Sequence, residues 1–155
     1  MSNIQQNTAC SGKNSAEQLE VAIVGAGFAG MYMLYRLRQL GLSSRVYETG
    51  SGVGGTWYWN RYPGARCDVE SMQYSYQFSD ELQQEWEWSE KYSTQPEILR
   101  YANHVADRFD LKRDIQFNTR VESAIFNEES QRWDIRTDKG NQVSAAFCVM
   151  ATGCL

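Results

Sequence analysis

The chain carries three glycines at G-x-G-x-x-G spacing directly after a short β-branched run that ends at Val24. Between a strand and a helix, this spacing suits a pyrophosphate. Gly25 lets the backbone leave the strand, Gly27 removes a Cβ where phosphates would approach, and Gly30 lets the helix pack closely on the strand. The free N–H groups of the first helical turn attract the anion, as does the helix dipole. The spacing is not decisive alone, because glycine-rich turns also serve packing.

A carboxylate follows at the distance that a ribose contact requires. Glu48 lies 23 positions after Gly25, at the end of an expected second strand over 45–48. A carboxylate there accepts hydrogen bonds from both ribose hydroxyls and repels a 2′-phosphate. We therefore expect an adenosine with a free ribose, as in FAD or NAD, and exclusion of NADP from this position. The alternative is a solvated glutamate at a strand end.

A second glycine-rich stretch, Gly50 to Thr56, comes directly after this acid. Adjacent Gly54 and Gly55 would let the backbone approach a second part of a long cofactor, which an extended FAD requires and NAD does not. The alternative is a flexible surface loop. A third stretch of small residues, Ala151-Thr152-Gly153, ends a buried-looking strand and would also admit a cofactor backbone.

An aromatic block over 56–71 follows the second glycine stretch. Its flat apolar surface could wall an isoalloxazine ring, and Arg66 and Asp68 could order polar ligand groups beside it. The alternative is that the aromatic residues form core or an interface to another domain, with solvated charges. For Trp59 and Tyr62 the second interpretation is favoured, whereas Trp57 and Asp68 suit either.

Composition excludes several other classes of function. The net charge is −4 and the pI about 5.0, without a basic stripe, which argues against a nucleic acid partner. Four cysteines without C-x-x-C pairing and one histidine, His104, argue against a structural metal site. Neither a bilayer-length apolar run nor a secretory signal is visible, so we expect a cytoplasmic protein without membrane contact.

The elements that must position these residues follow from periodicity. Residues 1–18, rich in Ser, Asn and Gln, are expected to be a disordered leader, and 19–155 one domain. Thr94-Gln95-Pro96-Glu97 is typical of a capping box that begins a packing helix, with His104 off its apolar stripe. The remaining expected elements are a strand over 19–24, a helix over 28–40, strands over 115–117, 121–126 and 133–137, a hairpin turn over 138–141 and a strand over 142–149.

Together, the three glycine-containing features resemble the FAD-binding domain of flavoproteins with two dinucleotide-binding domains. The fold so implied is α/β, a doubly wound parallel sheet (Rossmann-like) with an inserted β-meander. The run Gly54-Gly55-Thr56-Trp57-Tyr58-Trp59-Asn60-Arg61-Tyr62-Pro63-Gly64-Ala65-Arg66-Cys67-Asp68 resembles the Baeyer–Villiger monooxygenases, particularly the phenylacetone, cyclohexanone and steroid monooxygenase group. The segments 94–99 and 108–111 resemble that group as well.

The resemblance implies a flavin, reduced by NADPH, that forms a C4a-peroxyflavin with O₂. This species adds to a ketone, and migration of a carbon gives an ester or lactone; the small-molecule ketone and O₂ are the partners, with no protein partner inferred. Asp68 is the implied catalytic residue, paired with an active-site arginine outside this chain. Arg66, Cys67 and Asp68 match the segment that faces the nicotinamide of NADP. The implied FAD-binding residues are Gly25, Gly27, Ala29, Gly30, Glu48, Gly55, Thr56, Trp57, Tyr58, Trp59, Asp68, Tyr74, Val121, Ala151, Thr152 and Gly153.

The chain departs from the family in three respects. It lacks that arginine, a second G-x-G-x-x-G for NADPH and the fingerprint F-x-G-x-x-x-H-x-x-x-W-P, and it stops at Leu155. We therefore expect an incomplete fragment, the N-terminal piece of a longer enzyme, which does not oxidise ketones alone. The alternatives are a flavin monooxygenase that oxidises nitrogen or sulfur, and a FAD-binding fragment with no activity of its own.

Overall fold

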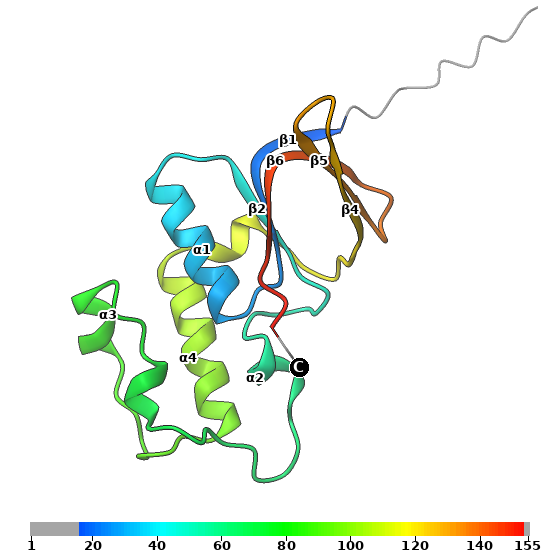
Figure 1. Ribbon diagram of the computed structural model, residues 1–155. Helices are drawn as coiled ribbons and strands as arrows, with labels where there is room; N and C mark the ends of the chain where they lie inside the picture. Colours follow the sequence, from blue (N-terminus) through cyan, green and yellow to red (C-terminus); the bar gives the residue numbers. More distant parts are fainter. Residues whose placement is uncertain (1–15, 154–155) are drawn as a thin grey trace, which may run out of the picture.

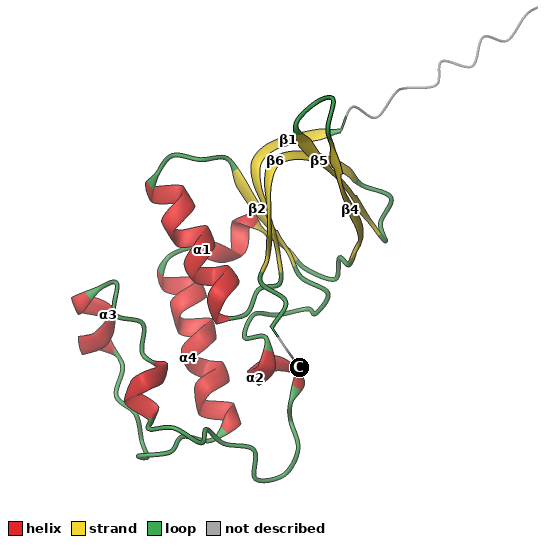
Figure 2. Ribbon diagram, viewed as in Figure 1, coloured by secondary structure: helices red, strands yellow, loops and turns green. Residues whose placement is uncertain are grey.

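The computed structural model describes residues 16–153, and these residues build one six-stranded mixed sheet with helices (Figures 1 and 2). The strand order is β3-β2-β1-β6-β5-β4. The pairs β3–β2, β2–β1 and β1–β6 are parallel, and the pairs β6–β5 and β5–β4 are antiparallel. The strands are β1 (Glu17–Val24), β2 (Ser44–Tyr47), β3 (Ile115–Gln116), β4 (Val121–Asn127), β5 (Arg132–Thr137) and β6 (Gln142–Met150).

Helices α1 and α4 pack on one face of the parallel strands, and the antiparallel strand β5 packs on the other face. On the helical face, α1 (Phe28–Gln39) and α4 (Gln95–Arg108) share a core with Val21, Ile23 and Val46. On the other face, Ala22 and Tyr47 pack with Ile135 and with β6. Alternating residues of β1 and β2 thus enter different cores, since successive strand residues point to opposite faces. The Rossmann-like α/β fold with its meander is confirmed.

Helix α1 owes its limits to two glycine-containing segments. It begins after Gly27 and buries Met31, Leu34 and Leu37, which recur at helical spacing. At its end, Gly41 has a φ of +72° and donates its N–H to Arg38 O, while Leu42 N–H reaches Leu37 O, both at 3.0 Å. This pair of bonds is a Schellman motif, and the positive φ explains why the sequence has glycine there.

A long insertion between β2 and β3 carries the aromatic residues. It contains α2 (Thr56–Trp59), the 3₁₀ turn η1 (Ser71–Tyr74), α3 (Asp80–Glu85), α4 and the 3₁₀ turn η2 (Leu111–Asp114). Figure 1 shows α2 and α3 on either side of α4, beyond the sheet. Trp57 and Ile98 form one small core there, and Leu82, Tyr101 and Val105 another. The insertion therefore has packing of its own against the long helix.

Two expectations need correction. Strand β1 begins at Glu17, so the last two residues of the expected leader belong to the sheet; residues 1–15 of that leader lie outside the described residues. The capping box is wrong: Thr94 makes no side-chain cap, and Glu97 instead accepts hydrogen bonds from Ser89 N–H and Oγ at 2.9 and 2.8 Å. A serine in a preceding loop competes for that carboxylate, and local spacing cannot reveal such a partner.

Candidate functional site

The three segments of small residues meet at the carboxyl end of the parallel strands. A Cβ on Gly25, whose φ is +102°, would lie 2.6 Å from Ala151 O. One on Gly30 would lie 1.9 Å from Gly25 O, and one on Gly55 2.9 Å from Gly27 Cα. In addition, Gly54 N–H donates to Ala26 O at 3.0 Å. The backbones therefore touch at points that only glycine permits, in the crevice where open α/β sheets bind ligands.

Among the glycines that the structure describes, Gly27 stands apart because its position has no structural need for glycine. Its φ is −73°, which any residue adopts, and a Cβ there would meet its nearest neighbour at an ordinary 3.5 Å. The missing side chain leaves the backbone N–H groups at the start of α1 open to an approaching group. A diphosphate uses that arrangement, so the residues present fit a dinucleotide.

Glu48 is buried directly below this turn. Only 5% of its surface is exposed, and its Oε2 accepts Ala26 N–H at 2.7 Å while its Oε1 accepts Gly50 N–H at 2.7 Å. The expected acid is thus at the crevice, and it also connects the first and second glycine stretches. Each carboxylate oxygen has a second acceptor position, so contact with ribose hydroxyls is compatible with both bonds.

The aromatic block divides into a buried and an exposed part. Trp57 is buried and packs against Ile98, and its backbone carbonyl accepts a hydrogen bond from Gln95 Nε2. Trp59 is 59% exposed, and Tyr62 is exposed as well. Tyr58 lies against the Gly50 to Gly52 loop. The core interpretation therefore applies to Trp57, for which the sequence left both interpretations open. Trp59 and Tyr62 are not core residues, and their contact with another domain stays a prediction.

Sequence reasoning missed Gln95 and Ser51 as residues that hold this region. In the sequence, Gln95 indicates only part of a helix start, and Ser51 only part of a glycine-rich loop. Gln95 donates to the Trp57 carbonyl, 38 positions away, and Ser51 N–H donates to the Tyr58 hydroxyl, seven positions away. No pattern of residue types signals such contacts.

The segment after α2 brings an acid and a phenol together. Tyr74 packs edge-on against Trp57, with ring centroids 5.4 Å apart. Burial raises the pKa of Tyr74, and the nearby charges of Cys67 and Asp68 raise it further. Asp68 itself is exposed.

Arg66 and Cys67 lie on the same segment but in different environments. Arg66 is exposed and its Nη1 contacts Glu90 Oε2 at 2.9 Å and Tyr92 O at 2.7 Å. Cys67 is buried, with its N–H bonded to Ser93 O. A nicotinamide contact by Arg66 would use donors that those two oxygens do not occupy.

The remaining expected FAD residues lie in the first turns of two helices, after β6 and in the meander. Ala29 and Thr56 are exposed in the first turns of α1 and α2, and Thr152 and Gly153 are exposed after β6. Val121 begins β4 and lines a cleft of about 330 Å³ with Trp133 and Cys148. The glycine residues, Glu48 and α2 are thus brought together, whereas Val121 belongs to the meander.

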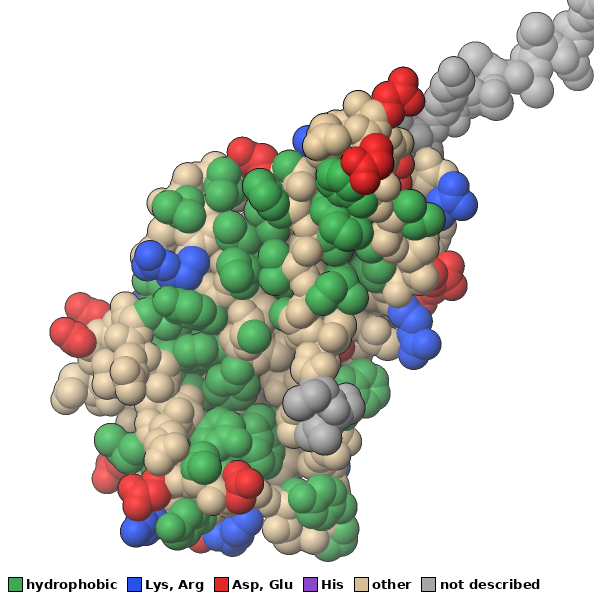
Figure 3. Space-filling view, viewed as in Figure 1, with side chains coloured by type: hydrophobic (Ala, Val, Ile, Leu, Met, Phe, Trp, Pro, Cys, Tyr) green, Lys and Arg blue, Asp and Glu red, His purple; other side chains and the backbone are tan. Residues whose placement is uncertain are grey.

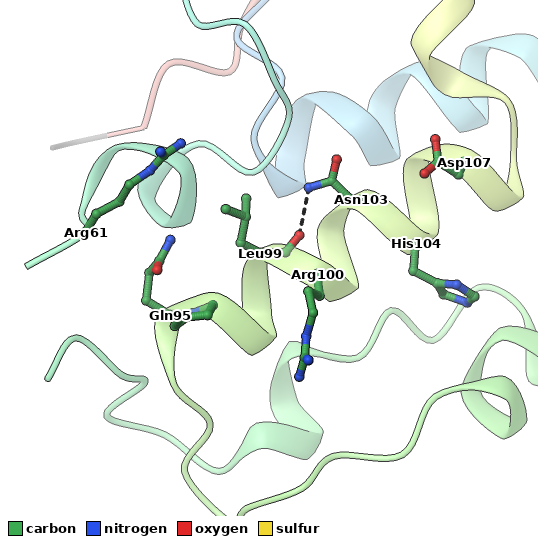
Figure 4. A pocket seen from close by; sticks show the side chains of 8 residues that line it. Arg61, Gln95, Leu99, Arg100, Asn103, His104 and Asp107 are labelled. Carbon is green, nitrogen blue, oxygen red and sulfur yellow. Dashed lines mark hydrogen bonds between the residues drawn. The ribbon is translucent and has the colours of Figure 1, made fainter. Parts of the chain in front are cut away.

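A further pocket along α4 is separate from the crevice. Arg61, Gln95, Leu99 and Arg100 contribute to its lining (Figure 4). The guanidinium groups of Arg61 and Arg100 point in different directions there, so no common anion site forms. Leu99 Cδ1 packs toward Gly54 and helps to separate this pocket from the glycine stretches.

Within residues 16–153 no helix has the length and apolar character to cross a membrane. The same residues contain no group of three or more histidine, cysteine or acidic side chains arranged for a metal ion. The described cysteines, Cys67 and Cys148, are both free thiols.

Comparison with known proteins agrees with this geometry. Residues 23–86 match the model of an NAD(P)-binding Rossmann-like domain. An acetone monooxygenase (methyl acetate-forming) of Gordonia sp. is 47% identical over 91% of this chain, and a phenazine N-monooxygenase of Lysobacter antibioticus is 46% identical over 92%. The structure of an oxidized steroid monooxygenase bound to NADP is 65% identical over 88% of this chain, with a TM-score of 0.86.

The chain spans about a quarter of the length of these relatives, 26% in each case. Formation of methyl acetate from acetone is insertion of an oxygen atom beside a carbonyl, which is the Baeyer–Villiger reaction. Other relatives of similar identity include a Baeyer–Villiger monooxygenase by name. Over about nine-tenths of its length, this chain is therefore related to the Baeyer–Villiger monooxygenases and corresponds to about a quarter of such an enzyme.

Proposed function

We propose that this chain supplies the FAD-binding part of an NADPH-dependent Baeyer–Villiger monooxygenase that converts a ketone into an ester or lactone. The observation that carries the proposal is the meeting of three glycine-containing segments around Gly27, whose own backbone does not require glycine. A dinucleotide is the ligand that uses such an opening, and the activities by which the relatives are named give the reaction class.

In this proposal the chain's residues bind and orient the cofactor. The N–H groups at the start of α1 hold the diphosphate. Glu48 accepts hydrogen bonds from the ribose hydroxyls while it keeps those from the Ala26 and Gly50 N–H groups. When bound, FAD would carry electrons from NADPH to O₂, and O₂ would supply the oxygen atom that is inserted. Asp68, exposed near Tyr74, then fixes polar groups at the flavin and nicotinamide side.

The apolar surface of the chain supports a role as part of a larger assembly of domains. Large hydrophobic side chains remain exposed, among them Met72, Phe147 and Met150 at 71, 66 and 63%. Figure 3 shows hydrophobic side chains running along one face, over the sheet and the helices. Extended apolar surface of this kind marks contact with further protein.

The proposal is tested by titrating the chain with FAD and following the quenching of flavin fluorescence. We expect Gly27→Ala to unfold at nearly the wild-type temperature and to weaken FAD binding at least tenfold, because the new Cβ occupies the phosphate approach. The control is Gly140→Ala, in the hairpin turn with a φ of +77°, for which we expect the opposite result. It should cost about 1 kcal/mol of stability and keep FAD affinity.

A competition experiment tests the role of Glu48 separately. ADP-ribose should displace FAD, whereas 2′-phospho-ADP-ribose should not, because the carboxylate repels the additional phosphate. Equal displacement by both compounds contradicts the role of Glu48, whereas flavin fluorescence that the wild-type chain leaves unchanged contradicts the FAD site.

A second candidate, an N-oxidising flavin monooxygenase, is favoured by one observation, the 46% identity to the phenazine N-monooxygenase. Enzymes for both reactions would use the same FAD-binding part. The product of the complete reading frame, assayed with NADPH and O₂, distinguishes them: an ester from phenylacetone supports the first proposal, and an N-oxide from phenazine with no ester supports the second.

We also propose that the protein acts in the cytoplasm, with a small ketone and O₂ as its partners. The two described free thiols, Cys67 and Cys148, suit a reducing compartment, and NADPH is the reductant that the proposed reaction consumes. Fractionation of cells that express an epitope-tagged protein tests this location.

A further inference from the structure

Tyr58 holds the loop that follows Glu48 by its hydroxyl group and by its ring. The Tyr58 hydroxyl accepts Ser51 N–H at 3.1 Å and lies 2.7 Å from Ser51 Oγ. A Cβ on Gly50 would lie 2.7 Å from Tyr58 Cε1, and one on Gly52 3.1 Å from Tyr58 Cε2. The loop therefore rests on the ring so closely that only glycine fits at its first contact.

The same loop fixes the carboxylate of the ribose-binding acid. Gly50 N–H donates to Glu48 Oε1 at 2.7 Å, and Gly50 O accepts Asn118 N–H at 3.0 Å. Glu48 Oε1 also lies 3.1 Å from the Cβ position of Gly50, so a shift of this glycine moves a group in contact with the carboxylate. Position of the loop and orientation of the acid are thus coupled.

Tyr58 is itself held in place from the side of α2. The guanidinium of Arg61 lies over the Tyr58 ring, 4.7 Å from its centroid, and Arg61 Nε donates to Tyr58 O at 2.7 Å. The Trp59 ring meets the Tyr58 ring edge-on at 4.9 Å. The ring thereby forms a fixed support under a loop that is rich in glycine and has no rigidity of its own.

We propose that Tyr58 is a positioning residue that acts through the Gly50–Gly52 loop to orient Glu48 toward the adenosine ribose. The inference rests on the proposed FAD site. The sequence predicts that Tyr58 contacts FAD directly. Here its role is indirect instead, because its hydroxyl and the edge of its ring already contact the loop. Tyr58 therefore favours binding of ligands that contain an adenosine ribose, and it does not affect binding of the flavin ring.

The first experiment needs no ligand. Tyr58→Phe removes the hydroxyl and keeps the ring, and Tyr62→Phe is the matched control on an exposed tyrosine. Hydrogen exchange by NMR should show faster exchange of the Ser51 and Gly50 amides, by about tenfold or more, in Tyr58→Phe only. Faster exchange at Ser51 with an unchanged Gly50 amide overturns the coupling to Glu48.

The second experiment is a double-mutant cycle on affinity. Tyr58→Phe should weaken FAD and ADP binding about fivefold, as loss of a modest hydrogen bond does, and leave FMN binding unchanged. In a Glu48→Gln background the same change should have no further effect on FAD binding. An equal loss for FMN, or an undiminished effect in the Glu48→Gln background, overturns the inference. If Glu48→Gln alone leaves FAD affinity unchanged, the proposed FAD site is contradicted instead.

Discussion

The carboxylate of Glu48 accepts the backbone N–H of Ala26, with 2.7 Å between Oε2 and the nitrogen. The bond joins the end of β2 to the turn that leaves β1, across 22 positions of sequence. A buried carboxyl group thus fixes the turn before any ligand arrives. The side chain expected to bind a ribose therefore also contributes to the fold, and the two roles are separable by measurement.

Replacement of Glu48 should lower stability even without a nucleotide. Glu48→Ala leaves the Ala26 and Gly50 amides without their acceptor in a buried site, and we expect a loss of about 2–4 kcal/mol in the free energy of unfolding. Glu48→Gln, which keeps one acceptor oxygen, should lose less. Urea unfolding followed by circular dichroism measures both, with the exposed Glu128→Ala as control. A Glu48→Ala protein as stable as the control would contradict the structural role.

Gly30→Ala should prevent the fold from forming normally. Its Cβ would lie 1.9 Å from the backbone oxygen of Gly25, and a backbone atom cannot move aside without displacing the turn. We expect a loss of several kcal/mol, at the upper end for single substitutions, or an insoluble protein.

The comparison for this variant is Gly64→Ala, whose φ is +82° and whose Cβ would meet nothing within 4 Å. It should cost only the backbone strain, about 1 kcal/mol. Soluble yield and the midpoint of thermal unfolding distinguish the two variants, and similar values for both would show that the close approach of Gly30 is relieved easily.

Arg38 connects α1 to the end of α4, and its removal should destabilise the chain. Its Nη1 donates to Phe109 O at 3.1 Å and to Asp110 O at 2.8 Å, and its Nε contacts Asp114 Oδ2 at 2.6 Å. Arg38→Leu leaves these carbonyls and the partly buried carboxylate without a donor, which we expect to cost about 2–3 kcal/mol. Chemical unfolding measures the loss. Arg36→Leu, on the exposed side of α1, should stay within about 0.5 kcal/mol of wild type.

The carboxylate of Glu97 should make stability depend on pH in the acid range. Burial acts to raise the pKa of Glu97, but the hydrogen bonds from Ser89 and the charge of Arg100 outweigh it and hold the pKa below its usual range. A lowered pKa in the folded state gives stability above the unfolded value of about 4.3, and this stability is lost as the pH falls through the folded pKa.

Thermal unfolding between pH 3 and 7 tests the role of Glu97. Ser89→Ala should reduce the acid-dependent part of the unfolding temperature, because it removes one bond to the charged form. Glu87→Gln, on an exposed side chain, should leave the profile unchanged. A Ser89→Ala profile identical to that of wild type would mean that the Ser89 hydroxyl does not hold the pKa of Glu97 down.

Much of the fold was predictable because its signals are local. The expected strand at β1, the α1 helix and its end at Gly41, and the hairpin between β5 and β6 all agree with the structure to within two residues. The Thr94 capping box was wrong because Ser89, in a loop before the helix, takes the Glu97 carboxylate. The FAD and NADP contacts of individual residues stay predictions.

The sequence by itself determined the glycine spacing, the acid at the end of β2, and the alternation that makes strands and helices. These follow from backbone geometry and side-chain periodicity, which act over a few residues. Only the tertiary structure decided that Gly55 touches Gly27, that Ala151 meets Gly25, and that Tyr58 supports the loop beside Glu48. Such contacts arise from how the sheet and the insertion pack in space, and residue spacing along the chain carries no record of them.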